Sequence, residues 1–392
     1  MRKVLHVSKY YFPFRGGTEQ IAQDCVNSLM GQYEQKVICF NDGLDNETDD
    51  VDGIEVIRTG CFATIASQGL SRTIGRKMKD VMQKFKPDII IFHYPNPFVA
   101  HYLLKYIGKE TKLAVYWHLD IVKQKVLKQF FVRQNKRLIE RADVLIATSP
   151  AYVEGSPWLS GAKGKCRVVP NCINVERLQE SPEANAKAVE IREQNKNKII
   201  CLAVGRHTAY KGFKYLIQAA HLLDDRFQIY ITGKGEETEN LKIEAGDDRK
   251  IHFLGLVDDV ELKGYLNAMD IFCFPSITKN EAFGLALAEG MYYGKPAVTF
   301  TIPGSGVNYV CLNGEDGIEV PNRDIEKYAE AMKGLANDEK LRARMGAAGK
   351  KRVEENFLDS QFKDNILRVI DELYSSYLPK GEQIRSEKFN WN

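Results

Sequence analysis

The sequence predicts an α/β protein with two Rossmann-like, doubly wound parallel sheets, one in each half of the chain. Three observations lead to this prediction. Apolar runs of strand length recur in both halves, the stretches between them repeat their apolar residues at helical spacing, and a polar segment separates the two series. The 392 residues also exceed the roughly 250 to 300 over which a single core keeps growing.

The strands are predicted from runs in which polar residues do not alternate, as is typical of strands buried on both faces. In the first half they are VLHVS, KVICF, IEVIRT, DIIIFH, LAVYWH, VLIATS and RVVPN, and in the second KIICLAVG, QIYITG, IHFLG, IFCFPS, PAVTF and GIEV. Helical spacing between them is clearest in two sets: Ile21, Cys25 and Leu29, and Leu216, Ile217, Ala220 and Leu223. The two domains are expected to face each other across a cleft, with ligands beyond the carboxyl ends of the strands.

The predicted boundaries divide the chain into an N-terminal domain, 1–175, a C-terminal domain, 176–355, and a final segment, 356–392. The stretch SPEANAKAVEIREQNKNK, residues 181–198, is polar enough to be read as the linker. In the final segment, SQFKDNILRVIDELYSSYL has the apolar spacing of a packed helix, and the tail after it is polar.

Charge is distributed unevenly along the chain. Residues 1–175 contain 25 Lys and Arg against 17 Asp and Glu, a net charge of +8, and the remainder contains 30 against 35, a net charge of −5. This asymmetry predicts an anionic partner for the first half, and an anionic membrane surface fits better than nucleic acid, because no basic motif is interleaved with stacking aromatics. The stretches 72–86 and 120–141 are both basic. The first is also amphipathic, and such a helix either lies on an anionic membrane or simply packs on the core.

A cytoplasmic protein is expected from the same sequence. No apolar run approaches the ~18 to 20 residues of a membrane span, and the N-terminus enters a strand pattern without a signal-peptide cleavage site. Eight scattered cysteines without a C-x-x-C pair are read as reduced thiols.

Two pairs of residues are candidates for binding phosphate. Gly16 and Gly17 open a helix after the first strand, where glycines let the backbone approach a diphosphate and the helix amides favour negative charge. Arg206 and Lys211 follow the first strand of the second half, and two cations at a strand's carboxyl end suit a pyrophosphate.

Two glutamates eight positions apart, Glu281 and Glu289 in NEAFGLALAEG, are candidates for binding sugar hydroxyls. On a helix they would be ~12 Å apart at about 1.5 Å per residue. A glycosidase pair needs its carboxyls roughly 5 to 9.5 Å apart. The two glutamates are therefore read as contacts to different parts of one long ligand, and cations with carboxylates in one domain suit a nucleotide sugar.

Histidines end two neighbouring strands of the first half. His118 is a candidate donor to a developing charge or a sugar hydroxyl, and His93, Tyr94 and Asn96 are candidates for lining the acceptor site. The one D-x-D, Asp50 to Asp52, lies in what is read as an acidic turn before a strand, and no His or Cys cluster occurs, so no metal is predicted.

Taken together, these residues resemble the retaining family-4 glycosyltransferases of GT-B fold. Glu281 and Glu289 resemble the family's E-x7-E signature, and Arg206 and Lys211 resemble its donor-phosphate pair. Gly16 and Gly17 resemble its glycine turn, and His118 resembles its N-domain histidine. Stretches such as VLHVSKYYFPFRGGTEQ and EAFGLALAEGMYYGKP look closest to bacterial enzymes that assemble O-antigen, capsule or exopolysaccharide, including GDP-mannose-dependent mannosyltransferases.

The resemblance implies roles for these residues. Glu281 would bind the donor sugar, Glu289 the ribose, and the backbone of Phe283, Gly284 and Leu285 the sugar and phosphate, while Arg206 and Lys211 would stabilise the leaving group. No metal or other cofactor would be needed, and the last helix would return to the N-terminal, acceptor-binding domain. The loop TIPGSGVNYV departs from the family pattern near the donor site.

The reaction expected from this resemblance is transfer of a hexose from a nucleotide sugar, GDP-mannose being favoured, to a lipid-linked saccharide at the inner face of the cytoplasmic membrane. Three alternatives remain at this stage. The donor is a UDP-hexose or UDP-N-acetylhexosamine, the protein is a nucleotide-sugar epimerase on the same fold, or it binds nucleotide sugars without catalysing a reaction.

Overall fold

The computed structural model describes residues 1–14, 16–65, 68–120 and 125–375 and divides into two compact units. The first combines Met1–Ile146, Ala162–Val169 and the chain from Phe362 onward, and the second combines Ala147–Gly161 with Pro170–Gln361. The predicted polar tail lies outside the described residues. No helix among the described residues is long and apolar enough to cross a membrane.

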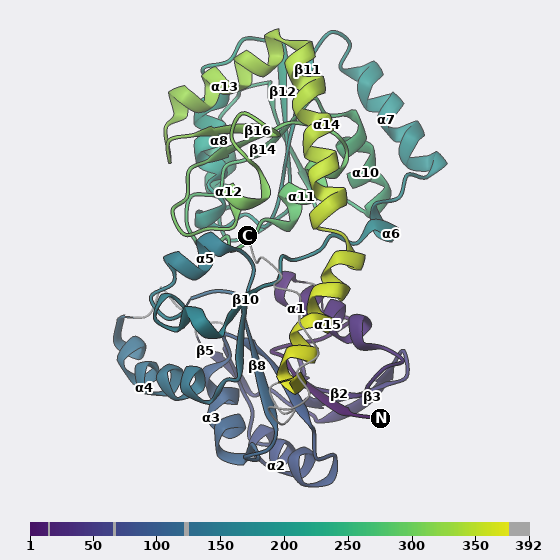
Figure 1. The fold of residues 1–392 in the computed structure, drawn as a ribbon. Coiled ribbons are helices and arrows are strands. Elements are labelled where there is room, and N and C mark those ends of the chain that lie inside the picture. The colour runs from purple at the N-terminus through teal and green to yellow at the C-terminus, as the bar shows by residue number, and fades with distance from the viewer. Residues whose placement is uncertain (15, 66–67, 121–124, 376–392) are drawn as a thin grey trace. The chain divides into compact units, whose positions relative to one another are not determined.

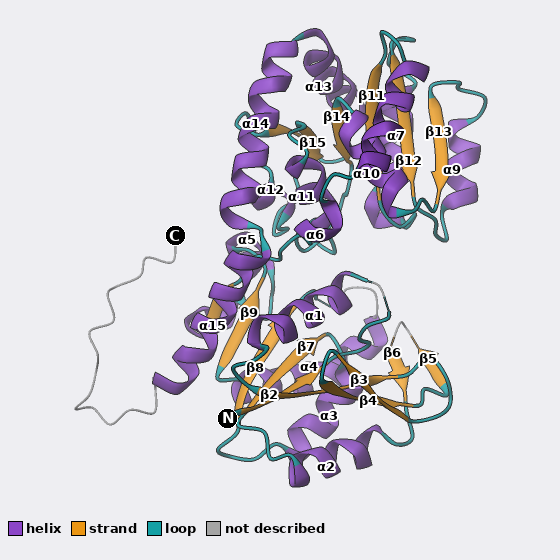
Figure 2. Cartoon of the chain, turned by 90° about the vertical axis from the view of Figure 1, so that its right-hand side faces the viewer, coloured by secondary structure: helices purple, strands orange, loops and turns teal. Residues whose placement is uncertain are grey.

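The first unit contains an eight-stranded sheet with helices on both faces (Figure 2). In sheet order its strands are β10 (Cys166–Val168), β9 (Val144–Ala147), β8 (Lys112–Trp117), β7 (Ile89–Tyr94), β1 (Lys3–Val7), β2 (Glu34–Phe40), β4 (Ile54–Thr59) and β3 (Glu47–Val51). Strands β1, β2, β4, β7, β8 and β9 pair in parallel. A separate hairpin joins β5 (Ala63–Ile65) to β6 (Gln68–Leu70).

The helices of the first unit cover the apolar sheet. They are α1 (Gly17–Leu29), α2 (Ile74–Lys84), α3 (Pro97–Tyr106), α4 (Lys125–Arg141) and α15 (Asp359–Ser375). Helix α15 places its apolar residues in the core of this unit, and two contacts hold its C-terminal half: Arg167 Nε lies 2.6 Å from a Glu372 carboxylate oxygen, and the Arg2 guanidinium lies 3.5 Å from the Tyr374 ring centroid.

One prediction for the first half is wrong. The acidic segment around Asp50 is strand β3, which pairs antiparallel with β4 at the edge of the sheet, and only Asp52 and Gly53 form the turn between them. An edge strand can expose alternate polar residues to water. Asp49 of β3 forms an ion pair with Arg58 of β4, which stabilises this edge.

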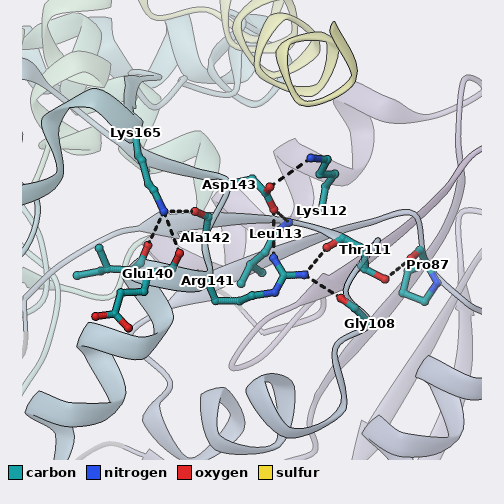
Figure 3. A network of polar contacts seen from close by, with 11 residues as sticks. Pro87, Gly108, Thr111, Lys112, Leu113, Glu140, Arg141, Ala142, Asp143 and Lys165 are labelled. Atoms are coloured by element: carbon teal, nitrogen blue, oxygen red, sulfur yellow. Dashed lines mark hydrogen bonds and ion pairs between the residues drawn. The ribbon is translucent and has the colours of Figure 1, made fainter. Parts of the chain in front are cut away.

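A network of polar contacts fixes the end of α4 to the neighbouring strands (Figure 3). The Lys165 ammonium donates to the carbonyls of Glu140 and Ala142 at 2.9 and 2.7 Å, which satisfies orphan acceptors at the helix C-terminus. Arg141 donates to the carbonyl of Gly108, and Asp143 accepts from the Leu113 amide at 2.9 Å. Several basic residues of the first half therefore have structural partners.

The second unit contains a six-stranded parallel sheet (Figure 1). In sheet order its strands are β13 (Ile251–Gly255), β12 (Phe227–Thr232), β11 (Ile199–Val204), β14 (Ile271–Phe274), β15 (Ala297–Phe300) and β16 (Gly317–Val320). The chain winds outward from β11 to β13, then returns past β11 to β14 and continues outward to β16. This reversal gives the sheet a topological switch point between β11 and β14, where doubly wound sheets bind ligands.

Helices lie on both faces of this second sheet. They are α7 (Pro182–Gln194), α8 (Phe213–Ala220), α9 (Thr238–Ala245), α10 (Asp259–Ala268), α11 (Leu285–Tyr292), α13 (Ile325–Asn337) and α14 (Glu339–Asn356). Shorter segments complete the chain: α5 (Pro150–Gly155), η1 (Ser160–Lys165), α6 (Val175–Leu178), η2 (Ala209–Lys211) and α12 (Val307–Val310).

The predicted linker is also wrong, because most of residues 181–198 form α7. Ser181 caps this helix, its hydroxyl accepting from the Ala184 amide at 3.2 Å, and Pro182 occupies the first turn. The buried residues Ala184, Ala188 and Ile191 recur at helical spacing and pack this helix against α10. The segment is polar because the opposite face of the helix is exposed.

Candidate functional site

The centre of the candidate site in the second unit is a buried ion pair at the switch point. Lys211 follows β11, Glu281 follows β14, and the Lys211 Nζ lies 2.5 Å from the Glu281 Oε2, with the two side chains only 13% and 11% exposed. Glu281 also accepts a hydrogen bond from the Ser276 hydroxyl at 2.9 Å. The sequence therefore brings one cation and one carboxylate from separate loops into direct contact.

Local backbone geometry explains this approach of the two loops. Gly212, directly after Lys211, has a φ of +67°, and a Cβ at this position would lie 2.0 Å from the Pro275 carbonyl oxygen. The Ile277 amide donates to the Tyr210 carbonyl at 3.0 Å, which joins the same loops. A side chain at position 212 would therefore separate Lys211 from Glu281.

Electrostatics keep Lys211 charged despite its burial. Burial by itself would lower the pKa of the Lys211 ammonium, but the Glu281 carboxylate outweighs that effect and raises the pKa above its ordinary value. Arg206 lies exposed on the same loop, and its side chain has no hydrogen-bond or ion-pair partner among the described residues. The site thus offers one cation held by a carboxylate and a second cation that is open to a ligand.

Helix α11 begins beside this pair. The helix starts at Leu285, not at Glu281, so the two glutamates of the signature lie on a loop and a helix respectively. Gly284 precedes the helix with a φ of +103°, and Phe283 is buried. The first amides of a helix have no intrahelical acceptor and favour a negative group, so this end suits the phosphate contact predicted for Phe283, Gly284 and Leu285.

Glu289 lies one turn into α11 and forms an ion pair with Arg177. Arg177 also contacts Asp259 at 3.2 Å, so one guanidinium joins the start of α10 to the signature helix. Burial raises the pKa of the Glu289 carboxyl, and the charge of Arg177 opposes that effect. Arg177 is not distinguished from a surface arginine by anything in VERL, so the sequence by itself does not mark it as a site residue.

The loop that departs from the family pattern supports the Glu281 segment. The Ser305 hydroxyl donates to the Glu281 carbonyl, and the Gly306 amide donates to the Ala282 carbonyl at 3.1 Å. The Thr148 hydroxyl donates to the same Ala282 carbonyl at 2.8 Å. Sequence reasoning missed the contacts of Thr148 and Ser305 because they join separate segments of the chain. It also missed Ser276, only five residues before Glu281, because no local pattern shows where a single serine hydroxyl points.

In the first unit, two of the predicted histidines are in direct contact. His93 is the second-last residue of β7 and His118 directly follows β8, and His93 Nδ1 lies 3.0 Å from His118 Nε2. The His118 ring also stacks on Tyr116, with centroids 4.5 Å apart. Burial lowers the pKa of His118 to about 3, so its imidazole is neutral at physiological pH.

The remaining predicted acceptor residues differ in their surroundings. Tyr94 is fully buried, stacks on Trp117 with centroids 3.8 Å apart, and accepts a hydrogen bond from Asn135 at 2.8 Å. Asn96 is also fully buried, but neither polar atom of its side chain has a partner among the described residues. Tyr94 therefore has a packing role in this structure, whereas Asn96 has unused hydrogen-bonding capacity.

The glycine turn of the first unit lies at the start of α1. Gly16 is extended, with a φ of −174°, and Gly17 is the first residue of the helix. A Cβ at Gly17 would meet no atom within 4 Å, so nothing inside the unit requires glycine at that position. The space beside Gly17 is open, and no contact in the structure tests the predicted binding of a diphosphate there.

Two doubly wound α/β units, with a buried cation and carboxylate at the switch point of the second, have the architecture of the GT-B fold, and the class of protein is that of the glycosyltransferases. The family is identified by two matches that together span most of the chain: residues 15–177 match the model described as Glycosyltransferase Family 4, and residues 185–352 the model described as Glycosyl transferases group 1. The chain belongs to these glycosyltransferases.

Similar proteins carry related names. The chain is 28% identical to the D-rhamnosyltransferase WbpZ of Pseudomonas aeruginosa, over 91% of this chain and 92% of that protein. It is 29% identical to the O-antigen chain mannosyltransferase C of Escherichia coli, over 96% and 99%.

Solved structures share the fold. A sucrose-phosphate synthase from Thermosynechococcus elongatus superposes with a TM-score of 0.78 at 18% identity, covering 96% of this chain and all of that chain. Anabaena HepE, in complex with UDP-glucose, gives a TM-score of 0.76 at 17% identity, covering 95% of this chain and all of that chain. At these identities the similarity shows the fold alone, and it agrees with the predicted GT-B architecture.

Proposed function

We propose that this chain is a retaining, metal-independent hexosyltransferase that moves a sugar from a nucleotide sugar to a lipid-linked saccharide during synthesis of lipopolysaccharide O-antigen or a related surface polysaccharide. The observation that carries the proposal is the Lys211–Glu281 pair at the switch point, beside the N-terminus of α11. It combines a phosphate-binding cation with a hydroxyl-binding carboxylate at one point of the unit.

When a nucleotide sugar binds, the contact between Lys211 and Glu281 would be replaced by contacts of each side chain with the ligand. Its diphosphate attracts Lys211 and the exposed Arg206, and its sugar hydroxyls donate to the Glu281 carboxylate. As the glycosidic bond breaks, negative charge grows on the departing phosphate, where the two cations and the start of α11 stabilise it. Glu289, held by Arg177, accepts from the ribose hydroxyls.

Retention of configuration is assigned to a front-face reaction. Glu281, the carboxylate that we place against the donor sugar, accepts a hydrogen bond from Ser276, and we assign it as a sugar contact and not as a nucleophile. In the proposed step the bond between the sugar and the phosphate oxygen breaks, the acceptor oxygen bonds to the same carbon from the same face, and the departing phosphate takes the acceptor proton. His118, a neutral imidazole, supports the sugar by a hydrogen bond.

The donor sugar we favour has the manno configuration, as in GDP-mannose. Two of the relatives support this choice, because one is named a mannosyltransferase and the other a D-rhamnosyltransferase, and D-rhamnose is 6-deoxymannose. The alternative is a UDP-hexose or UDP-N-acetylhexosamine, which the UDP-glucose complex of HepE supports.

An anionic membrane surface is proposed as the location of the acceptor. The apolar face of α2 is buried, which leaves the exposed side chains of Arg76, Lys79, Lys84 and Lys86 to act by charge alone. In α4, Arg133, Lys136 and Arg137 are likewise exposed, and the rest of the predicted basic stretch before Phe131 lies outside the described side chains. Bound to the inner face of the cytoplasmic membrane by these cations, the protein would reach its lipid-linked acceptor.

The first test is a thermal-shift panel of GDP, UDP, GDP-mannose and UDP-sugars, since a ligand at 100 times its Kd adds about 2.7 kcal/mol of stability. We expect selective stabilisation by GDP and GDP-mannose, and selectivity for UDP would favour the alternative donor. Transfer is then assayed with a lipid-linked acceptor in the presence of EDTA, where activity should persist. Conversion of the donor without acceptor would instead favour an epimerase, and binding without any turnover would contradict the enzymatic proposal.

A further inference from the structure

The contact between His93 and His118 has the geometry of a hydrogen bond between two imidazole rings that meet edge to edge. The ring planes are within 9° of parallel, and the centroids lie 5.2 Å apart while the facing nitrogens are separated by only 3.0 Å. Nitrogens closer than the centroids indicate rings that meet side by side, nearly in one plane. This is the arrangement in which an N–H of one imidazole points at the lone pair of the other.

Both rings are neutral at physiological pH, so each carries a single N–H. Burial lowers the pKa of His93 well below its ordinary value, and the neighbouring His118 and His6 oppose its protonation further. Burial also lowers the pKa of His118. A neutral imidazole donates from one nitrogen and accepts at the other, so fixing the proton on one ring fixes it on both.

The surroundings of His93 decide which nitrogen carries its proton. Its Nε2 is buried and has no hydrogen-bond partner among the described residues. A buried N–H without an acceptor is rare and costly, whereas an unused acceptor lone pair is tolerated more often. The proton of His93 therefore belongs on Nδ1, from which it is donated to Nε2 of His118.

We infer that His93 is a positioning residue that holds His118 as the Nδ1–H tautomer, so that His118 presents a donor, and not an acceptor, to the sugar. The inference rests on the proposed function only in taking the sugar as the partner of that donor. Since Nε2 of His118 is occupied by His93, the ring is also fixed in orientation. His118 accepts a hydrogen bond from His93 at Nε2, and its Nδ1–H is then the group that donates to a hydroxyl oxygen of the sugar.

The test reads the tautomer directly, in the free protein, without any donor. Histidine is labelled with 15N, the seven histidines are assigned by single substitutions, and long-range 1H–15N correlations are recorded near pH 7. We expect His118 to be protonated at Nδ1 and unprotonated at Nε2, with His93 also protonated at Nδ1. An Nε2–H tautomer or a doubly protonated ring at His118 would overturn the inference.

Two variants separate positioning from folding. His93→Asn keeps an N–H near the position of Nδ1, so the His118 tautomer should persist and more transfer should remain than in a variant without that donor. His93→Leu removes that donor, so the His118 signals should report a mixture of tautomers and transfer should fall about 10-fold or more. Equal activity of the two variants would contradict the positioning role.

The control is His6→Leu, which removes another buried imidazole of the same sheet. The described hydrogen bond of His6 is to Gln35, at 2.8 Å, so the His118 tautomer and transfer by the folded protein should be unchanged. The expected tautomer in a protein that lacks transfer would contradict the proposed function alone. Transfer by a protein with the opposite tautomer would contradict this inference alone.

Discussion

At the scale of single residues, the Lys211–Glu281 pair links stability and activity. Lys211→Met should leave the Glu281 carboxylate buried without its partner, which costs about 3 to 5 kcal/mol of unfolding free energy. The double variant Lys211→Met with Glu281→Gln carries no buried charge and should recover most of that loss. Urea unfolding of the wild type, the single variants Lys211→Met and Glu281→Gln, and the double variant measures this coupling.

Activity should not follow stability in the same variants. Lys211→Met and the double variant should both lose transfer by roughly 10²-fold or more, because the cation at the leaving group is absent from each. Initial rates at saturating donor provide the measurement. Activity near wild type in either variant would contradict the phosphate role of Lys211.

Arg177 permits a second prediction at this scale. Without the guanidinium, burial should raise the pKa of Glu289 further, and a protonated carboxyl accepts ribose hydroxyls poorly. Arg177→Ala should therefore raise the donor KM about 10-fold, with a smaller change in kcat, and the loss should increase as pH falls from 8 to 6. A pH-independent effect would indicate that Arg177 acts only by joining α6 to α11.

At the scale of elements, α7 shows how a helix can be mistaken for a linker. Ser181→Ala should cost about 1 kcal/mol of unfolding free energy, because the Ala184 amide loses its capping acceptor. Ser181→Asp, which keeps an acceptor, is the matched control and should be close to wild type. Identical unfolding curves for all three proteins would indicate that residues 181–198 are a linker after all.

The exposed cations of α2 support a prediction about membranes. The triple variant Arg76→Glu, Lys79→Glu, Lys84→Glu should lose flotation with vesicles that contain anionic lipid, since each cation near such a surface contributes about 1 kcal/mol. Wild-type binding should weaken as salt increases. Lys196, Lys340 and Lys350 are exposed in the second unit, and their triple change to Glu is the control. Equal loss of flotation in both triple variants would indicate that the net charge of the protein, and not the surface of α2, determines vesicle binding.

At the scale of the whole molecule, buried histidines should make the protein sensitive to acid. Burial lowers the pKa of His6 to about 4 and that of His118 to about 3. Between these values and the ordinary 6.5, the unfolded chain binds more protons than the folded one, so unfolding free energy falls as pH decreases. For His6 alone the loss by pH 4 is about 3 kcal/mol. Unfolding curves at pH 7, 6 and 5 measure the slope, and His6→Leu should flatten it.

Much of the architecture was readable from the sequence. The thirteen predicted strand runs all appear as strands, because buried parallel strands need unbroken apolar runs that few other elements share. Strand β3 and helix α7 were missed for one reason. Both are exposed on one side, and their polar residues, read without a partner element, resemble a turn and a linker.

The sequence by itself determined the fold class, the order of elements and the chemical types needed for phosphate and hydroxyls, since these depend on local patterns along the chain. Only the tertiary structure decided which groups meet. The approach of Lys211 to Glu281 depends on Gly212 packing under Pro275, Arg177 reaches Glu289 across more than one hundred residues, and His93 meets His118 through strand register. Such contacts depend on distances between segments that no local pattern encodes, and they set the charges, tautomers and orientations on which the proposed reaction depends.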